Sequence, residues 1–108
     1  MYHKITAEQA KKIMDDNQDF ILLDVRTYDE WVESRIEGAV QIPDTEIRSR
    51  AADELPNKTA LILVYCRSGR RSVNAANALV EMGYSNIYDF GGIIDWKYCT
   101  VSGDSSLE

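Results

Sequence analysis

The sequence has few of the residues on which disulfide frameworks and metal sites depend. Its 108 residues include 2 cysteines, 1 histidine and 2 prolines. Cys66 and Cys99 are too few for a disulfide framework, and they do not have the spacing of metal ligands. The histidine, His3, lies near the N-terminus, which argues against a zinc site and against a Cys–His hydrolase. We therefore expect no metal ion and no other cofactor.

Long apolar runs are also missing. The longest, residues 60–66, falls far short of the roughly 18 residues of a membrane span. The first residues do not contain the apolar segment of a signal peptide. The net charge of −6 argues against a general binder of nucleic acid or of membrane surfaces. We expect a cytoplasmic protein without a membrane or nucleic-acid partner.

The length suits one compact domain and leaves no room for a second. We expect this domain to span residues 1–100. Residues 101–108 consist mostly of small and polar residues. They are typical of a disordered tail or of residues left from cloning.

Apolar stretches typical of strands alternate with helical patterns along the chain. Strands are expected at residues 20–25, 39–42, 60–65 and 86–90. Helices are expected from Thr27 to about Ser34, from Val73 to Met82, after Thr6, after Asp44 and, as a short turn, at residues 93–96. Strands that alternate with helices imply a parallel sheet covered on both faces.

Polar residues mark where the first three helices are expected to begin. Thr6 with Gln9, and Thr27 with Glu30, form capping boxes, in which the side chain of each residue bonds the backbone amide of the other. Asp44 is expected to cap the third helix with its carboxylate.

The stretch Cys66-Arg67-Ser68-Gly69-Arg70-Arg71-Ser72 lies between an apolar run and a helical pattern. Strand-end loops of α/β domains bind anions because the first amides of the following helix have no partners. The surrounding segment 55–80 contains lysine and arginine but no Asp or Glu. A positive field of this kind makes a cysteine a stronger nucleophile, so Cys66 is the candidate catalytic residue. Ser72 is expected to cap the helix and hold the shape of the loop.

Two other interpretations of Cys66 are less favoured. A free cysteine is often a small buried hydrophobic residue, but a strand end among arginines argues against that. Phosphatases with a cysteine nucleophile use the pattern C-x-x-x-x-x-R, whereas here Ser72 takes the place of the arginine and Arg71 comes one residue early. The shorter loop makes a smaller cradle, better matched to one sulfur atom than to a phosphate.

Residues outside this loop also have two interpretations each. Asp24, Arg26 and Glu30 lie at or beyond the end of another strand, where side chains can touch substrate. A structural network, for example an ion pair of Arg26 with Glu30, is the favoured alternative. Cys99 could act as a resolving thiol that forms a disulfide with Cys66, but simple packing is favoured.

Several of these segments together resemble a single-domain rhodanese over roughly residues 4 to 98. The matching residues are Leu23-Asp24-Val25-Arg26, Asp29-Glu30-Trp31, Ile36-Glu37-Gly38-Ala39, Ile42-Pro43, the loop from Cys66 to Ser72, Ala75, Ala76, Leu79, Gly83, Gly91-Gly92 and Trp96. The resemblance implies a three-layer α/β fold with a central, mostly parallel sheet of about five strands flanked by helices on both faces.

The resemblance also implies a sulfurtransferase. Cys66 would attack the outer sulfur of an anionic donor such as thiosulfate, hold it as a persulfide and pass it to a thiophilic acceptor such as cyanide or a thiol. The residues that would bind the donor and the persulfide are Arg67, Ser68, Gly69, Arg70, Arg71 and Ser72. Because three arginines cannot all point into one small loop, we expect one or two of them to face solvent.

Two points leave alternatives open. An acidic chain around a basic loop also fits a sulfur-carrier or docking module that receives a persulfide from a partner protein and acts poorly on small donors. In addition, many rhodaneses have a histidine where Arg35 stands. Arg35 keeps a hydrogen-bond donor but always carries charge, so the local hydrogen bonding is expected to differ.

Overall fold

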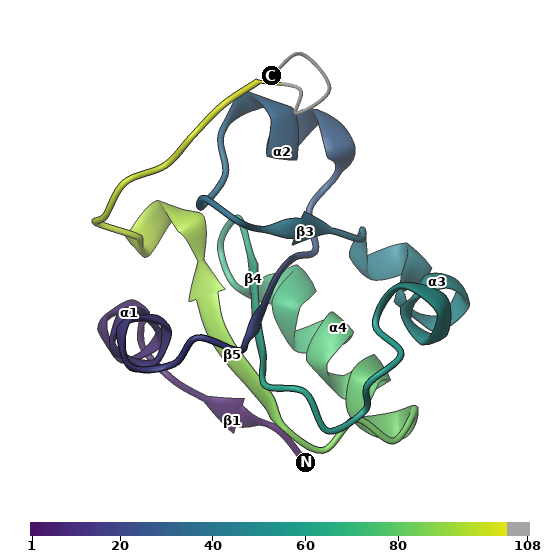
Figure 1. The fold of residues 1–108 in the computed structure, drawn as a ribbon. Coiled ribbons are helices and arrows are strands. Elements are labelled where there is room, and N and C mark those ends of the chain that lie inside the picture. The colour runs from purple at the N-terminus through teal and green to yellow at the C-terminus, as the bar shows by residue number, and fades with distance from the viewer. Residues whose placement is uncertain (104–108) are drawn as a thin grey trace.

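The structure is a computed structural model that describes residues 1–103. The greater part of the expected tail, residues 104–108, lies outside the described residues. In chain order the elements are β1 (His3–Lys4), α1 (Ala7–Asp16), β2 (Ile21–Asp24), α2 (Tyr28–Glu33), β3 (Val40–Gln41), η1 (Asp44–Glu46), α3 (Ile47–Glu54), β4 (Ile62–Cys66), α4 (Arg70–Glu81), β5 (Ile87–Gly92) and η2 (Ile93–Asp95) (Figure 1).

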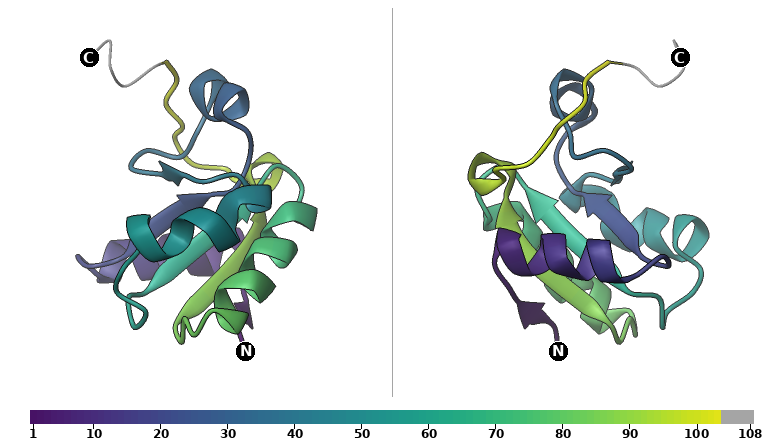
Figure 2. Two further views of the ribbon diagram at one scale, coloured as in Figure 1. Left: turned by 90° about the vertical axis from the view of Figure 1, so that its right-hand side faces the viewer. Right: turned by 60° about the vertical axis from the view of Figure 1, so that its left-hand side comes forward.

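The strands form one five-stranded sheet in the order β1-β5-β4-β2-β3, and every neighbouring pair is parallel. Helix α1 packs on β5 from one side, whereas α4 covers β4 and β5 from the other and carries α3 beside it (Figure 2). The expected three-layer α/β fold is thereby confirmed. Strand β1 was not predicted, because two exposed residues carry no recognisable period.

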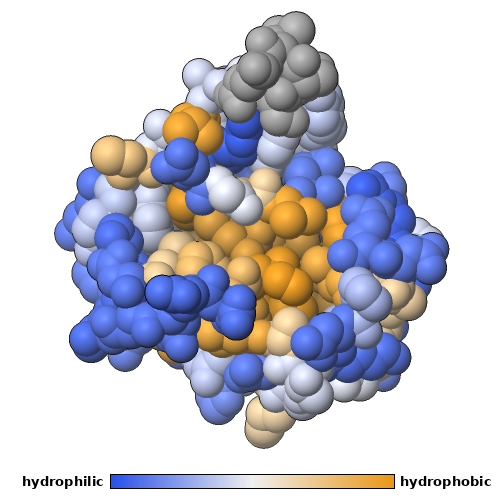
Figure 3. Space-filling model, in the orientation of Figure 1, coloured by the Kyte–Doolittle hydropathy of each residue, from blue (hydrophilic) through white to orange (hydrophobic). Residues whose placement is uncertain are grey.

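The core consists of two clusters, one on each face of the sheet. Leu23 and Val64 belong to the cluster beneath α3 and α4. Leu22 and Leu63, their neighbours in the chain, belong to the cluster beneath α1. Since successive side chains of a strand point to opposite faces, burial on both faces explains why these strands are continuous apolar runs. Apolar residues also gather at the centre of the face shown in Figure 3, ringed by hydrophilic ones.

The predicted capping boxes are confirmed, but the predicted cap at Asp44 is wrong. Thr6 and Thr27 cap α1 and α2, each with the reciprocal bond from the third residue along. Asp44 instead begins the 3-10 turn η1 after Pro43, and no side chain caps α3. The backbone amide of Asp44 donates to the carbonyl of Val25, which fixes this turn beside the end of β2.

The chain after η2 runs back across the molecule toward α2 (Figure 1). Arg35 and Val101 exchange two backbone hydrogen bonds of 2.8 Å, and the amide of Gly103 donates to the carbonyl of Val32. These bonds attach residues 101–103 to the segment around α2. None of the helices in residues 1–103 has the length and apolar character needed to cross a membrane.

Candidate active site

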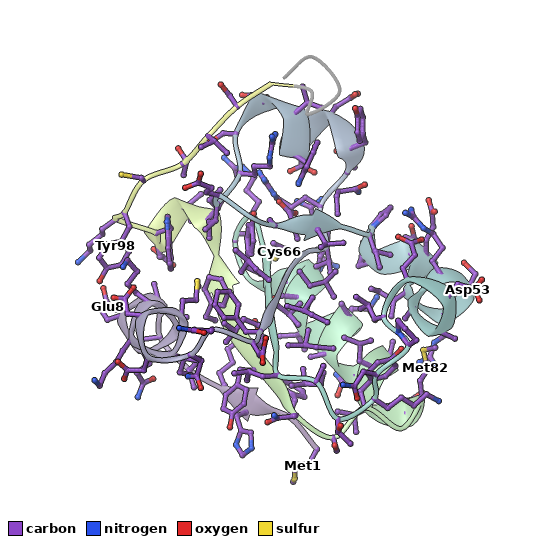
Figure 4. The ribbon with its side chains drawn as sticks, in the orientation of Figure 1. Met1, Glu8, Asp53, Cys66, Met82 and Tyr98 are labelled. Carbon is purple, nitrogen blue, oxygen red and sulfur yellow. The ribbon has the colours of Figure 1, made fainter. Side chains whose placement is uncertain are left out.

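Cys66 is the last residue of β4, at the end of the sheet that faces α2 (Figure 4). The chain turns at Gly69, whose φ of 106° lies in the region that favours glycine, and α4 begins at Arg70. The helix thus begins three residues before the predicted Val73. The predicted cap at Ser72 is wrong, because this residue lies inside the first turn and its hydroxyl donates to the carbonyl of Gly69.

The thiol of Cys66 lies at the floor of this loop. Its Sγ accepts a hydrogen bond of 3.0 Å from the amide of Gly69. The residue is buried, with 1% of its surface exposed. The first amides of α4 have no partner within the helix, so they supply a positive field next to the sulfur. The geometry matches a cradle for a small anionic sulfur species.

The end of β5 determines the shape of the loop. Gly92 pairs with Cys66 across the sheet, next to a register shift in the β4–β5 ladder. A Cβ on Gly92 would come within 2.2 Å of the carbonyl oxygen of Arg67. The two segments therefore pack backbone against backbone, and glycine is the residue that permits it.

Asp89 is a site-supporting residue that the sequence reasoning missed. It is fully buried in β5, and its Oδ1 accepts a 2.9 Å hydrogen bond from the amide of Gly91. Its Oδ2 accepts from Nζ of Lys4 at 3.2 Å. The carboxylate thereby fixes the turn that leads Gly92 to the cysteine loop. The sequence did contain a signal for this role, because Asp89 is an acidic residue inside an otherwise mostly apolar strand.

Among the described residues, one of the three loop arginines is held against the loop by an ion pair. Nη1 and Nη2 of Arg71 donate to Oε1 and Oε2 of Glu30 at 2.7 and 3.0 Å. These bonds lower the pKa of Glu30 to about 2, with a smaller contribution from Thr27 and against the opposing effect of burial. Arg67 and Arg70 are exposed, which agrees with the expectation that one or two arginines face solvent.

The pKa of Arg71 is raised, first by its bonds to Glu30, against the opposing effect of burial, and then by the charge of Glu30. Arg71 therefore carries its positive charge at this loop. Glu30, placed by the capping box of α2, holds that charge beside the loop.

The predicted pairing of Arg26 with Glu30 is wrong, because Arg26 pairs with Asp24. Nη2 of Arg26 lies 2.7 Å from Oδ2 of Asp24 and also donates to the carbonyl of Ser34. Burial alone would lower the pKa of Arg26, but the hydrogen bonds and charge of Asp24 raise it overall. Burial, aided by the charge of Asp24, raises the pKa of Tyr65 as well. This network joins β2 to the segment after α2.

Two hollows flank the cysteine loop. The smaller has a volume of 130 Å³, and its lining residues are Arg26, Glu30, Glu33, Ser34, Arg67, Ile93 and Ile94. The larger has a volume of 610 Å³ and lies on the other side, lined by Ser68 and Gly69 together with residues from β5, η2 and the start of α1. Ile94 lines both hollows and is 59% exposed, so it forms an apolar ridge beside the loop.

Arg35 is buried and performs a structural task at the position where many rhodaneses have histidine. Its guanidinium lies 3.7 Å from the centroid of the Trp31 ring. Its Nη1 donates to the carbonyls of Trp31 and Gly103. Cys99 lies exposed on the segment that this arginine helps to hold.

Comparison with known proteins places this geometry in a family. The pattern of the Rhodanese-like domain matches residues 6–99. The chain is 36% identical to thiosulfate sulfurtransferase PspE of Escherichia coli over 81 residues, which cover 75% of this chain and 78% of PspE. It is also 36% identical to a sulfurtransferase of Allochromatium vinosum, over 89% of each chain.

Solved structures agree with the sequence relatives. The Alr3790 protein from Anabaena sp. superimposes with a TM-score of 0.84 at 25% identity, over 94% of this chain and 95% of that one. A rhodanese with anions from E. coli superimposes with a TM-score of 0.71 at 35% identity, over 77% of this chain and 98% of that one. Sequence and fold lead to the same conclusion: this chain belongs to the family of rhodanese-like domains.

Proposed function

We propose that the protein is a sulfurtransferase that carries a sulfane sulfur as a persulfide on Cys66. The observation that carries the proposal is the amide of Gly69 directed at Sγ of Cys66, at the start of a helix. The relatives named as sulfurtransferases support the same activity. No second thiol or histidine is needed for this chemistry.

Transfer proceeds in two steps that balance without an oxidant. The thiolate of Cys66 attacks the outer sulfur of a donor such as thiosulfate, and the S–S bond of the donor breaks. Sulfite leaves with the electron pair, and Cys66 holds the outer sulfur as a persulfide anion. An acceptor such as cyanide then attacks that sulfur, leaves as thiocyanate and returns the electron pair to the Cys66 thiolate.

The loop lowers the barrier through electrostatics. The amide of Gly69, at the start of α4, points at Sγ of Cys66, where the persulfide charge develops, and Arg71 lies beside the loop in its ion pair with Glu30. The remaining loop residues, Arg67, Ser68, Arg70 and Ser72, shape the cradle and its rim. The 130 Å³ hollow suits a small donor, and the 610 Å³ hollow suits a bulkier thiol acceptor.

Intact-mass measurement after exposure to thiosulfate tests the proposal. The protein is expected to become heavier by one sulfur atom and to release it as thiocyanate when cyanide is added. Cys66→Ala should gain no sulfur, whereas the matched control Cys99→Ala should behave as the unchanged protein. A mass gain that persists in Cys66→Ala would overturn the assignment. Robust turnover of thiosulfate to thiocyanate without any partner protein would argue against the sulfur-carrier module.

A further inference from the structure

The charges at the mouth of the site cancel one another. Four charged residues line the 130 Å³ hollow beside the loop, namely Arg26, Glu30, Glu33 and Arg67. Two of them are already neutralised, because Arg26 pairs with Asp24 and Glu30 pairs with Arg71. Over residues 1–103 the lining of the hollow therefore has no net charge, whether or not these two partners are counted.

Glu33 and Arg67 are the charged groups that remain for a ligand. Both are exposed, and neither side chain forms a hydrogen bond or ion pair within residues 1–103. Arg67 alone would attract an anion. Glu33, lining the same hollow from the last turn of α2, repels it. The positive potential left for a donor comes mainly from the start of α4, which is equivalent to about half a unit charge.

A hollow whose charges are balanced in this way binds a dianion weakly. We infer that this site takes sulfur from donors that bring at most one negative charge, such as an alkyl persulfide or an organic thiosulfonate, and that Glu33 discriminates against dianionic thiosulfate. The inference rests on the proposed sulfur transfer at Cys66. It makes thiosulfate a working but poor donor, because each cation that lines the hollow is opposed by a carboxylate, Arg26 by Asp24 and Arg67 by Glu33.

Both preferred donors react by the same balanced step. With a persulfide R–S–SH, the Cys66 thiolate attacks the outer sulfur, the S–S bond breaks and R–S⁻ leaves with the electron pair, while the proton stays on the transferred sulfur. With a thiosulfonate, a sulfinate leaves in the same way. No oxidant or reductant is consumed in either case.

A pair of donors that differ by one charge tests the inference. The value of kcat/KM is measured with thiosulfate and with benzenethiosulfonate at low ionic strength, using cyanide as acceptor. Glu33→Gln should raise the value for thiosulfate by about three- to ten-fold and that for the thiosulfonate by about two- to three-fold, because the repulsion scales with donor charge. Added salt should reduce both gains.

The matched control is Asp53→Asn, which removes one acidic charge from α3, at the margin of the view in which Cys66 is central (Figure 4). It should leave both values within about two-fold, because Asp53 does not line the hollow and the effect of a charge falls with its distance from the donor. Equal gains with the two donors, no gain at all, or the same gain in Asp53→Asn would overturn the inference.

Binding in the absence of chemistry separates the inference from the proposed function. In a Cys66→Ala background, calorimetry should show that Glu33→Gln binds thiosulfate about three- to ten-fold more tightly. Unchanged affinity would overturn the charge selectivity even if the enzyme were active. If that affinity does rise but the unchanged protein forms no persulfide with either donor, the charge selectivity stands and the proposed function fails.

Discussion

Gly92 lies so close to Ser68 that a Cβ at residue 92 would be 2.6 Å from the Cα of Ser68. Gly92 itself has φ of −119°, an ordinary value for any residue. Glycine is therefore required there by the close approach of two backbones and not by backbone conformation. The last strand of the sheet acts as a template for the loop that holds Cys66.

Replacing Gly92 by alanine should displace the loop. We expect Gly92→Ala to lower the rate of persulfide formation by at least about ten-fold and the free energy of unfolding by about 1–3 kcal/mol, as overpacking does. The control is Gly38→Ala, which strains a positive φ but meets no atom within 4 Å. It should lose stability yet keep the reactivity of Cys66. Equal losses of reactivity in both variants would contradict the template role.

The ion pair of Glu30 with Arg71 should make stability depend on pH. The folded pKa of Glu30 is about 2, below the ordinary value of 4.5, so its contribution is full above pH 4.5 and is lost as pH falls toward 2. Glu30→Gln should reduce the free energy of unfolding by about 1–2 kcal/mol at neutral pH, a value discounted for partial exposure.

Urea denaturation across the acid range measures this difference. The difference in free energy of unfolding between Glu30→Gln and the unchanged protein should shrink below pH 4.5 and be lost as the pH falls through the folded pKa of about 2. Glu8→Gln, which removes an exposed pair with Lys97, should change stability by no more than about 0.5 kcal/mol. A difference between Glu30→Gln and the unchanged protein that stays constant with pH would show that the ion pair does not account for it.

The hydrogen bond of Asp89 to the amide of Gly91 should contribute more to stability and to sulfur transfer than its ion pair with Lys4 does. Asp89→Ala leaves the Gly91 amide without a partner, and we expect a loss of about 1–3 kcal/mol together with slower sulfur transfer. Lys4→Met removes only the bond to a lysine that is 58% exposed and should cost less than about 1 kcal/mol. Urea denaturation and the rate of persulfide formation are measured on the same samples of both variants. A larger loss in Lys4→Met than in Asp89→Ala would refute the prediction.

The two cysteines should differ in access to bulky reagents. Cys99 is exposed, whereas Cys66 is buried beneath the loop. A maleimide under native conditions should modify Cys99 quickly and Cys66 slowly, although thiosulfate still converts Cys66 to the persulfide. Peptide mapping by mass spectrometry distinguishes the sites. Equal labelling would mean that the loop is open in solution.

The sequence predicted the features that depend on local chemistry. The capping boxes of Thr6 and Thr27 require residues only three positions apart, and the strand before Cys66 is a continuous apolar run. Ser72 is not a cap because the chain already turns at Gly69, three residues earlier, and Asp44 is not a cap because a 3-10 turn begins there and α3 starts only at Ile47. Cap patterns cannot show which of two neighbouring turns the backbone adopts.

The pairings within the site could not be predicted because they span long stretches of chain. Glu30 and Arg71 are 41 residues apart, and Lys4 and Asp89 are 85 apart. No periodicity links such residues, so the sequence alone assigned Glu30 the wrong partner, Arg26. The contact of Lys4 with Asp89 follows once β1 is known to pair with β5, because the two residues are opposite each other in that ladder. The contact of Glu30 with Arg71 joins the starts of α2 and α4.

The sheet order also has a consequence for biosynthesis. Strand β1, the first to leave the ribosome, pairs with β5, which is made last. Gly92, the template for the cysteine loop, belongs to that same late strand. The loop that holds Cys66 therefore cannot take its final shape until β5 has been made and has paired with β4.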